Sequence, residues 1–413
     1  MRAAAIGLVV ILVLAFVLYD SGERDDPPRS GAAARHGSLA AAVDDVLSGE
    51  DQLTRAAELA TALQGFGPEA LADVEEAWAT IEEDTGGSKT LELTLLVGWW
   101  CRYEPEGAFS WLNGKYRHLN PVMMTTLVRC WATRSPIAAS RAVTSLPKVR
   151  QTQDTPQLIN AVVIGWNASG ESGVEEFLMA LSSDVNRQIA LTALANAKVR
   201  RDGVEEAIRW AQALPDSASG DFKQQAHRRV ATAIAGVDPI RAAGWAETLL
   251  AGEWGTGVPR RVAQRWSQED GQAAMEWLRS LPTSPDLPKA FEDTYRRWLS
   301  NDREAALEWL PDQKRDASLD PAVSLYAQSV ARDDPEAALP WAAQVQDATR
   351  RDETLEQIAR IWMRRDGDTA RAWIETSDLS DNARQRVYAA AEKNRARKQP
   401  GRRAPRAAES LAK

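Results

Sequence analysis

The chain has 413 residues, of which 44% are hydrophobic and 26% are charged, and its 58 acidic and 50 basic side chains give a formal net charge of −8. These values are ordinary for a folded soluble body, so they exclude a chain that lacks the apolar residues for a core. The length permits two or three compact domains or one elongated array.

The first 19 residues predict a membrane anchor. Ala3 to Tyr19 form an uncharged apolar run of 17 residues, at the short end of what a helix needs to cross a bilayer. A cleaved signal peptide, the alternative, would end this run with small residues in an A-x-A-like pattern, whereas the run ends in FVLYDSGERDD. We therefore expect residues 1–19 to form an uncleaved transmembrane helix.

Residues 20–38 are polar and rich in Pro, Gly and Ser, which predicts a flexible linker between the anchor and the body. Basic residues lie on both sides of the anchor, so their count does not settle its orientation. A short N-terminal arm beside a large body is the usual form of a single-pass anchor, which favours a body outside the cytoplasm. Because the chain prefers Arg to Lys and is rich in Ala, we expect a bacterial inner-membrane protein with a periplasmic body.

Residues 39–391 contain an internal repeat. Their apolar residues recur every three and four positions, which predicts helices and leaves no clear strand. Large apolar residues also recur in pairs separated by eleven positions: Trp100 and Trp111, Trp266 and Trp277, Trp298 and Trp309, and Trp362 and Trp373. Other units replace one member by a different residue, so the first members, called markers below, stand at positions 100, 131, 166, 199, 234, 266, 298, 330 and 362. Their steps of 31 to 35 residues predict nine repeats, and Leu63 and Val74 suggest a degenerate tenth at the N-terminal end.

Each repeat predicts two antiparallel helices. After the marker come a polar breaker and a capped helix start, such as Ser135-Pro136, Asp238-Pro239 or Asp334-Pro335. Eight residues after each marker stands an alanine, except for Val174 in the third repeat, so the second helix can approach the first closely. The two large residues and the small one share one seam, which favours tryptophans in the core over a ladder that binds sugars or bases.

The segment WMRRDGDTARAW, residues 362–373, resembles the helix-turn-helix centre of tetratricopeptide-like (TPR-like) repeats in the order and spacing of its aromatic, polar and small residues. The family's small glycine in the first helix is replaced here by residues such as Ile358 and Tyr326. The resemblance implies an all-α, right-handed α-solenoid over residues 39–391, with Sel1-like and HEAT-like arrays as structural alternatives. It also implies an extended concave surface that binds a peptide or a partner protein.

The two cysteines lie beside neighbouring markers, because Cys101 follows Trp100 and Cys130 precedes Trp131. On parallel first helices of stacked repeats these positions point to opposite flanks, so the two side chains can face each other. Two states stay open, namely a disulfide, which an oxidising compartment permits, or two free buried thiols.

Three tryptophans, Trp78, Trp99 and Trp254, lie outside the repeat positions. Trp254 stands in the Gly-rich segment AGEWGTGVP, which makes it the candidate for an exposed residue that contacts a partner. The alternative is a ring that folds back onto the core.

No residue pattern predicts a catalytic or metal site. DTG at residues 84–86 and SLPK at residues 145–148 match short catalytic motifs. The first needs a second carboxylate in a β-rich fold, and Pro147 prevents the helical turn that the second needs. The histidines, at positions 36, 118 and 227, are single and far apart. We therefore expect neither enzyme activity, nor a cofactor, nor a metal.

Residues 392–413 carry eight basic and two acidic residues without an apolar period, which predicts a disordered basic tail. Such a tail can bind anionic lipid, nucleic acid or wall polymer, or stay in loose contact with the acidic body. Together, these features predict a membrane-anchored scaffold for protein–protein interaction in the bacterial cell envelope. The alternative is an envelope enzyme, or its accessory subunit, that acts on cell-wall polymer.

Overall fold

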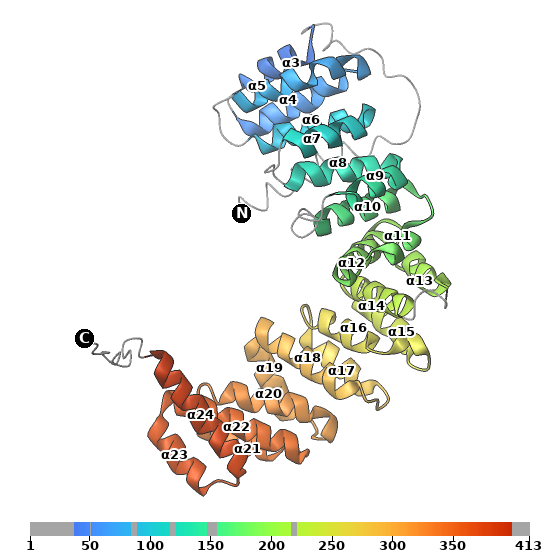
Figure 1. The fold of residues 1–413 in the computed structure, drawn as a ribbon. Coiled ribbons are helices and arrows are strands. Elements are labelled where there is room, and N and C mark those ends of the chain that lie inside the picture. The colour runs from blue at the N-terminus through green and yellow to red at the C-terminus, as the bar shows by residue number, and fades with distance from the viewer. Residues whose placement is uncertain are drawn as a thin grey trace, which may run out of the picture. The chain divides into compact units, whose positions relative to one another are not determined.

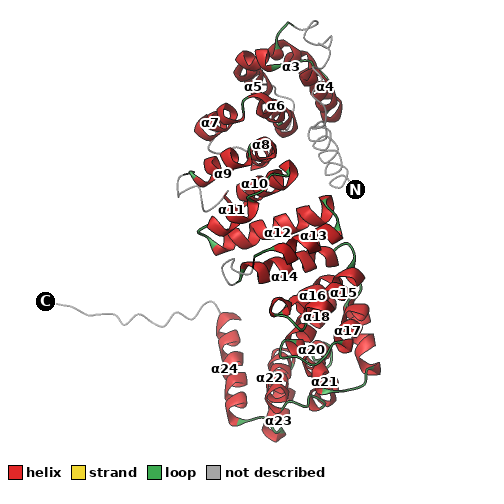
Figure 2. Cartoon of the chain, turned by 90° about the vertical axis from the view of Figure 1, so that its right-hand side faces the viewer, coloured by secondary structure: helices red, strands yellow, loops and turns green. Residues whose placement is uncertain are grey.

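The computed structural model describes residues 37–49, 51–83, 89–115, 121–146, 155–215 and 221–398. These residues form 22 α-helices, α3 to α24 (Figure 1), and four short 3-10 helices. Figure 2 shows helices and loops in the described part and no strand. The predicted all-α class is therefore confirmed for this part of the chain, which is consistent with an α-solenoid-like fold.

The predicted anchor, residues 1–19, and residues 20–36 of the predicted linker lie outside the described residues. Among the helices that the structure describes, none is long and apolar enough to cross a membrane. Helix α3 starts at Leu39, the first residue of the predicted body, and the hydroxyl of Ser38 accepts a hydrogen bond from the backbone N–H of Ala41 at 3.2 Å.

The chain divides into two compact units, called unit 1 (Met1–Phe222) and unit 2 (Lys223–Lys413). Unit 1 opens with three helices and a 3-10 turn, and four helix pairs follow. The opening elements are α3 (Leu39–Leu47), α4 (Gln52–Gln64), η1 (Pro68–Asp73) and α5 (Val74–Glu83). The pairs are α6 (Thr90–Tyr103) with α7 (Pro105–Lys115), α8 (Pro121–Arg134) with α9 (Pro136–Thr144), α10 (Thr155–Ser169) with α11 (Val174–Ala180), and α12 (Asp184–Arg201) with α13 (Val204–Ala213).

Unit 2 contains five helix pairs and a closing helix. The pairs are α14 (Phe222–Ala235) with α15 (Pro239–Leu249), α16 (Val258–Trp266) with α17 (Gly271–Ser280), α18 (Leu287–Asn301) with α19 (Arg303–Trp309), α20 (Asp320–Val330) with α21 (Pro335–Ala343), and α22 (Ala348–Arg365) with α23 (Gly367–Thr376). The closing helix is α24 (Asp381–Lys398), and η2 (Glu253–Gly255), η3 (Leu310–Asp312) and η4 (Ala317–Leu319) lie in connections. From α16 onward, each first helix packs on the first helix of the next pair, so α16, α18, α20, α22 and α24 form one continuous layer.

The predicted seam between the two helices of each pair is confirmed. The alanines eight residues after the markers are completely buried: Ala108, Ala139, Ala207, Ala242, Ala274, Ala306, Ala338 and Ala370. The large partners meet across the seam, with ring centroids 5.6 Å apart for Trp298 and Trp309 and 5.8 Å apart for Trp362 and Trp373. The repeated tryptophans therefore pack chiefly against one another and against the core.

Aspartates cap the second helices of unit 2. Asp238, Asp270, Asp302, Asp334 and Asp366 each accept a hydrogen bond from the backbone N–H three residues later, at 2.9 to 3.2 Å. The predicted cap at Ser135 is absent, because its side chain makes no capping hydrogen bond. The backbone of Ser135 resembles that of Asp238, and the serine hydroxyl of Ser38 does cap α3, so neither backbone angles nor side-chain length explains the difference.

The predicted start of the disordered tail at residue 392 is wrong. Helix α24 continues to Lys398, so residues 392–398 are helical. Ala383 and Val387 are buried in the cluster of apolar residues that α24 shares with α22 and α23. The closing helix therefore covers an apolar face that the last repeat would otherwise expose. Residues 399–413 lie outside the described residues.

Candidate functional site

The layer of first helices in unit 2 carries a groove of about 710 Å³. Residues of α18, α20, α22 and α24 line it, and seven of the twelve are charged, whereas Pro321 and Leu325 are its only apolar members. Pockets of this volume accommodate small molecules or a few residues of a peptide. The charged lining favours a polar ligand.

The repeat register places equivalent polar residues along this groove. Six residues before each marker of α18, α20 and α22 stand Glu292, Ser324 and Glu356, and two residues before each marker stand Arg296, Gln328 and Arg360. Each repeat thus contributes a pair four residues apart on one helix face. The paired side chains are bonded at 2.6 Å in α18, 3.2 Å in α20 and 2.5 Å in α22.

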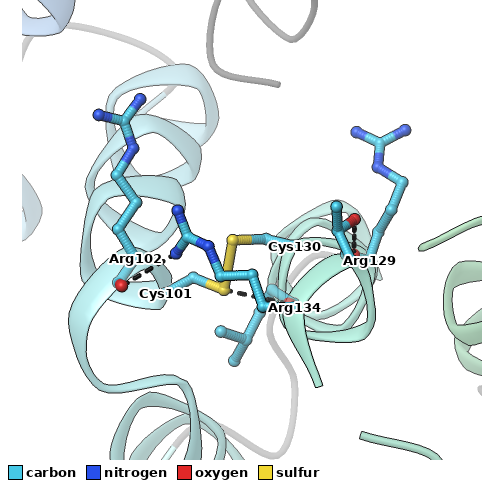
Figure 3. Close-up of a disulfide and its surroundings, with 7 residues drawn as sticks. Cys101, Arg102, Arg129, Cys130 and Arg134 are labelled. Carbon is cyan, nitrogen blue, oxygen red and sulfur yellow. Dashed lines mark hydrogen bonds between the residues drawn. A yellow bond between two sulfur atoms is a disulfide. The ribbon is translucent and has the colours of Figure 1, made fainter. Parts of the chain in front are cut away.

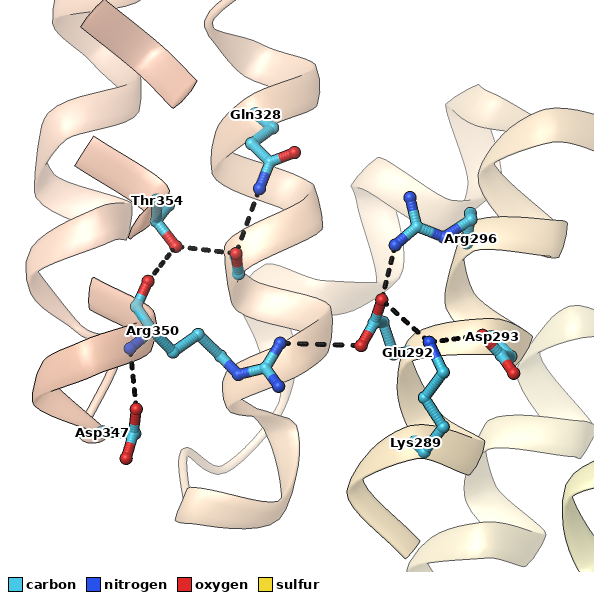
Figure 4. Close-up of polar contacts among 9 residues, drawn as sticks. Lys289, Glu292, Asp293, Arg296, Gln328, Asp347, Arg350 and Thr354 are labelled. Atoms are coloured by element: carbon cyan, nitrogen blue, oxygen red, sulfur yellow. Dashed lines mark hydrogen bonds and ion pairs between the residues drawn. The ribbon is translucent and has the colours of Figure 1, made fainter. Parts of the chain in front are cut away.

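The first charged group, called the Glu292 cluster, consists of Lys289, Glu292, Arg296 and Arg350. The carboxylate of Glu292 accepts hydrogen bonds from Arg296 Nη2 at 2.6 Å and Lys289 Nζ at 3.3 Å. Arg350 extends from α22 towards the same carboxylate, with 3.7 Å between Nη1 and Oε2 (Figure 4). Burial alone would raise the pKa of Glu292, but its bonds to Arg296 and Lys289 outweigh burial and lower that pKa. Glu292 is therefore ionised at neutral pH and is a poor general base.

The second charged group, called the Glu356 cluster, consists of Glu356, Arg360 and Arg386. Arg386 of α24 donates to Glu356 Oε2 from Nε at 2.9 Å and from Nη2 at 2.5 Å. Arg360 Nη2 lies 2.5 Å from the other oxygen. The hydrogen bond to Glu356 raises the pKa of Arg386. Both oxygens of Glu356 are thus held by guanidinium groups of two different helices.

An uncharged hydrogen-bond network centred on Ser324 of α20 lies between α18 and α22. Ser324 Oγ lies 2.7 Å from Thr354 Oγ1, and Gln328 Nε2 donates to the same serine oxygen at 3.2 Å. Thr354 is completely buried and also donates to the backbone oxygen of Arg350 at 2.6 Å (Figure 4). This network fixes the floor of the groove between the charged ends.

The two cysteines form a disulfide between the end of α6 and α8 (Figure 3). Their Cα atoms are 6.4 Å apart, Cys101 is fully buried and Cys130 is 9% exposed. Arg134 Nη1 donates to the backbone oxygen of Arg102 at 2.9 Å beside the bond (Figure 3). The disulfide therefore links two consecutive first helices of unit 1, and the alternative of two free thiols is not the state that the structure shows.

Trp254 is half-buried, so its predicted role as an exposed contact residue needs correction. Its ring stacks on His227 at a centroid distance of 6.3 Å, and Lys223 Nζ lies 5.3 Å from its centre. His227 is 1% exposed and stacks on Trp245 at 5.6 Å. Burial lowers the pKa of His227. The ring of Trp254 thus lies back against the helices, which was the alternative to an exposed contact residue.

Most residues of the remaining sequence patterns are not described by the structure. DTG at 84–86, two of the histidines, His36 and His118, and Lys148 of SLPK lie outside the described residues. The described part of the chain holds no group of three or more His, Cys, Asp or Glu residues placed to bind a metal ion. Trp78 and Trp99 are buried in unit 1, where Trp99 Nε1 donates to the backbone oxygen of Phe66 at 3.0 Å.

The groove was not singled out from the sequence, although the marker register contains the signal. Counting back six and two residues from the markers of α18, α20 and α22 identifies its three polar pairs. No protein-family model matches the chain, and no curated protein or solved structure matches it either. Function is therefore argued from the groove itself.

Proposed function

We propose that the chain is a membrane-anchored helical-repeat scaffold whose unit 2 groove binds a peptide or a segment of a partner protein in the bacterial cell envelope. The observation that carries the proposal is the groove, because two clusters of ordered arginines flank a neutral floor along successive helices. Successive helices of a repeat array present such positions in a row, which suits a chain-like ligand better than a compact one.

The finer architecture belongs to the same proposal. Nine helix pairs with steps of 31 to 35 residues support a right-handed TPR-like solenoid. The apolar run at residues 3–19 supports an inner-membrane anchor and a periplasmic body. A reporter that is active only outside the cytoplasm, fused after residue 38, should be active. Activity of a cytoplasm-only reporter at that position would contradict the topology.

Site-specific crosslinking in cells tests the groove. A photoreactive residue replaces Gln357, an exposed lining residue, in the full chain, and the control replaces Ile240, which is 75% exposed and lies outside the groove. We expect a crosslinked adduct at position 357 and none at position 240. Protease should degrade the crosslinked partner, whereas a wall hydrolase should not. An adduct that the wall hydrolase releases would favour the alternative of a wall-polymer protein. Equal crosslinking at both positions would rule out the groove as the binding site.

A further inference from the structure

Carboxylates and guanidinium groups are exposed to different degrees in the groove. The side chains of Glu292 and Glu356 are only 18% and 6% exposed, whereas those of Arg296 and Arg386 are 56% and 52% exposed. Arg350 and Arg360 are about one third exposed. The lining holds three acids and four arginines, and Glu353 is the one exposed carboxylate among them, so a ligand entering the groove meets mainly guanidinium groups.

The buried carboxylates hold these guanidinium groups in place. A guanidinium has five N–H donors, and the bonds to Glu292 and Glu356 use only one or two of them in each arginine. Orientation by a buried partner lowers the entropy that an arginine loses when it binds a ligand. Arginines fixed in this way favour planar anions that accept two parallel hydrogen bonds, as carboxylates do.

We propose that the groove binds an extended peptide through the side-chain carboxylates of two separated acidic residues, one at the Glu292 cluster and one at the Glu356 cluster. This inference rests on the proposed function, and it adds the chemistry of the ligand. The amides of Gln328 and Gln357 also line the groove, where they can bond to the peptide backbone. Ser324, which lines the groove and is bonded to the buried Thr354, carries no charge, so the part of the peptide that lies over it can be uncharged.

The geometry also limits the spacing of the two acidic residues. Neighbouring packed helices lie roughly 8–10 Å apart, so α18 and α22 are separated by roughly 16–20 Å. Arg350 reaches from α22 towards Glu292, which shortens the distance between the two clusters. An extended chain rises about 3.3 Å per residue, which places the two acidic residues roughly three to six positions apart. Glu353 is exposed on the lining and would repel a continuous acidic run. The groove should therefore prefer spaced acidic residues.

Fluorescence polarisation with the full chain in detergent tests this inference. The probes are labelled peptides, acetylated and amidated at their ends, that carry two Glu residues at varied spacing in a Gly/Ser background. We expect the Glu peptides to bind at least about tenfold more tightly than the same peptides with Gln or Lys. Affinity should be highest at spacings of roughly three to six residues and fall with added salt.

Variants locate the binding. Arg350→Gln and Arg386→Gln should each weaken binding of the tightest Glu peptide by about tenfold. The matched control is Arg371→Gln, because Arg371 is a half-exposed arginine on α23 that pairs with Asp368 at 2.7 Å outside the groove. Circular dichroism and the unfolding midpoint establish that each variant is folded.

The outcomes separate the two proposals. Equal binding of Gln or Lys peptides, with loss in the groove variants, overturns the acidic preference and leaves a peptide-binding groove. If Arg371→Gln weakens binding of the Glu peptide as much as Arg350→Gln does, the peptide binds by general charge attraction. This result would also overturn the inference. Failure of every probe overturns it too, and the proposed function then depends on the crosslink at position 357.

Discussion

Units 1 and 2 use the same helical hairpin with different regularity. The marker steps across unit 1, up to the first marker of unit 2, are 31, 35, 33 and 35 residues, whereas every later step is 32. Two second helices of unit 1 begin after glycines with positive φ, Gly173 at 106° and Gly203 at 90°, whereas every second helix of unit 2 begins at an aspartate cap. Unit 1 alone carries the disulfide.

The same difference explains where the groove lies. In unit 2, the positions six and two residues before the markers hold polar pairs: Arg228 and Thr232, Arg260 and Gln264, Glu292 and Arg296, Ser324 and Gln328, and Glu356 and Arg360. In unit 1, the equivalent positions hold mainly small or uncharged residues: Thr94 and Gly98, Thr125 and Arg129, Asn160 and Ile164, and Ala193 and Ala197. Gly165, beside this row, has no room for a Cβ, which would lie 2.4 Å from the backbone oxygen of Arg129. In unit 1 this helix face therefore carries small residues that permit close packing, whereas in unit 2 it carries polar and charged side chains.

The largest expected effect comes from removing the disulfide. This change should destabilise unit 1 alone, and an equal effect on unit 2 would contradict the distinction between the two units. Replacing Cys101 and Cys130 by alanine opens a loop with a sequence separation of 29. Chain-entropy arguments predict a loss of about 3–4 kcal/mol in the free energy of unfolding. Hydrogen exchange read peptide by peptide should show faster opening of α6 and α8 and no change in α16 to α23. Equal acceleration in both units would show that they unfold together.

This prediction also has a control in the native protein. Non-reducing peptide mapping of chain taken from its own compartment should recover Cys101 and Cys130 in one linked fragment. Two free thiols there would mean that the stabilisation does not operate in the cell, and would argue against an oxidising compartment.

A smaller effect tests the tight packing of unit 2. Gly271 begins α17, and a Cβ there would lie 2.2 Å from ring atoms of Trp298. Gly271→Ala should therefore destabilise unit 2 by about 1–3 kcal/mol in denaturant unfolding. Gly244 is the matched control, because it lies within α15 with nothing within 4 Å of an added Cβ. Gly244→Ala should stabilise the helix by up to about 1 kcal/mol. The same sign for both variants would contradict the close approach of α17 and α18.

The two units also show what the sequence can and cannot predict. Spacing alone identified the helix pairs and the buried alanines such as Ala274, because burial at a fixed period is a local property. The groove depends on how the repeats stack, because stacking decides which polar faces line one surface. Glu292 of α18 and Arg350 of α22 approach each other only in the stacked array. Trp254 shows the same limit, because the Gly-rich segment predicts a loop, whereas contacts with His227 and Lys223 decide where its ring lies.

The smallest effect compares the caps of the two units. Asp334 Oδ1 accepts a hydrogen bond from the backbone N–H of Ala337 at 3.0 Å, and Ser135 makes no such bond at the equivalent place in unit 1. Asp334→Ala should therefore cost about 1 kcal/mol of stability, both through the lost bond and through the lost negative charge at the helix start. Ser135→Ala should cost only a few tenths, because it removes no capping bond. Denaturant midpoints at constant m-value measure both changes. A loss of about 1 kcal/mol in Ser135→Ala would mean that its hydroxyl caps α9 in solution. The contrast between the second helices of the two units would then narrow to the two that begin after Gly173 and Gly203.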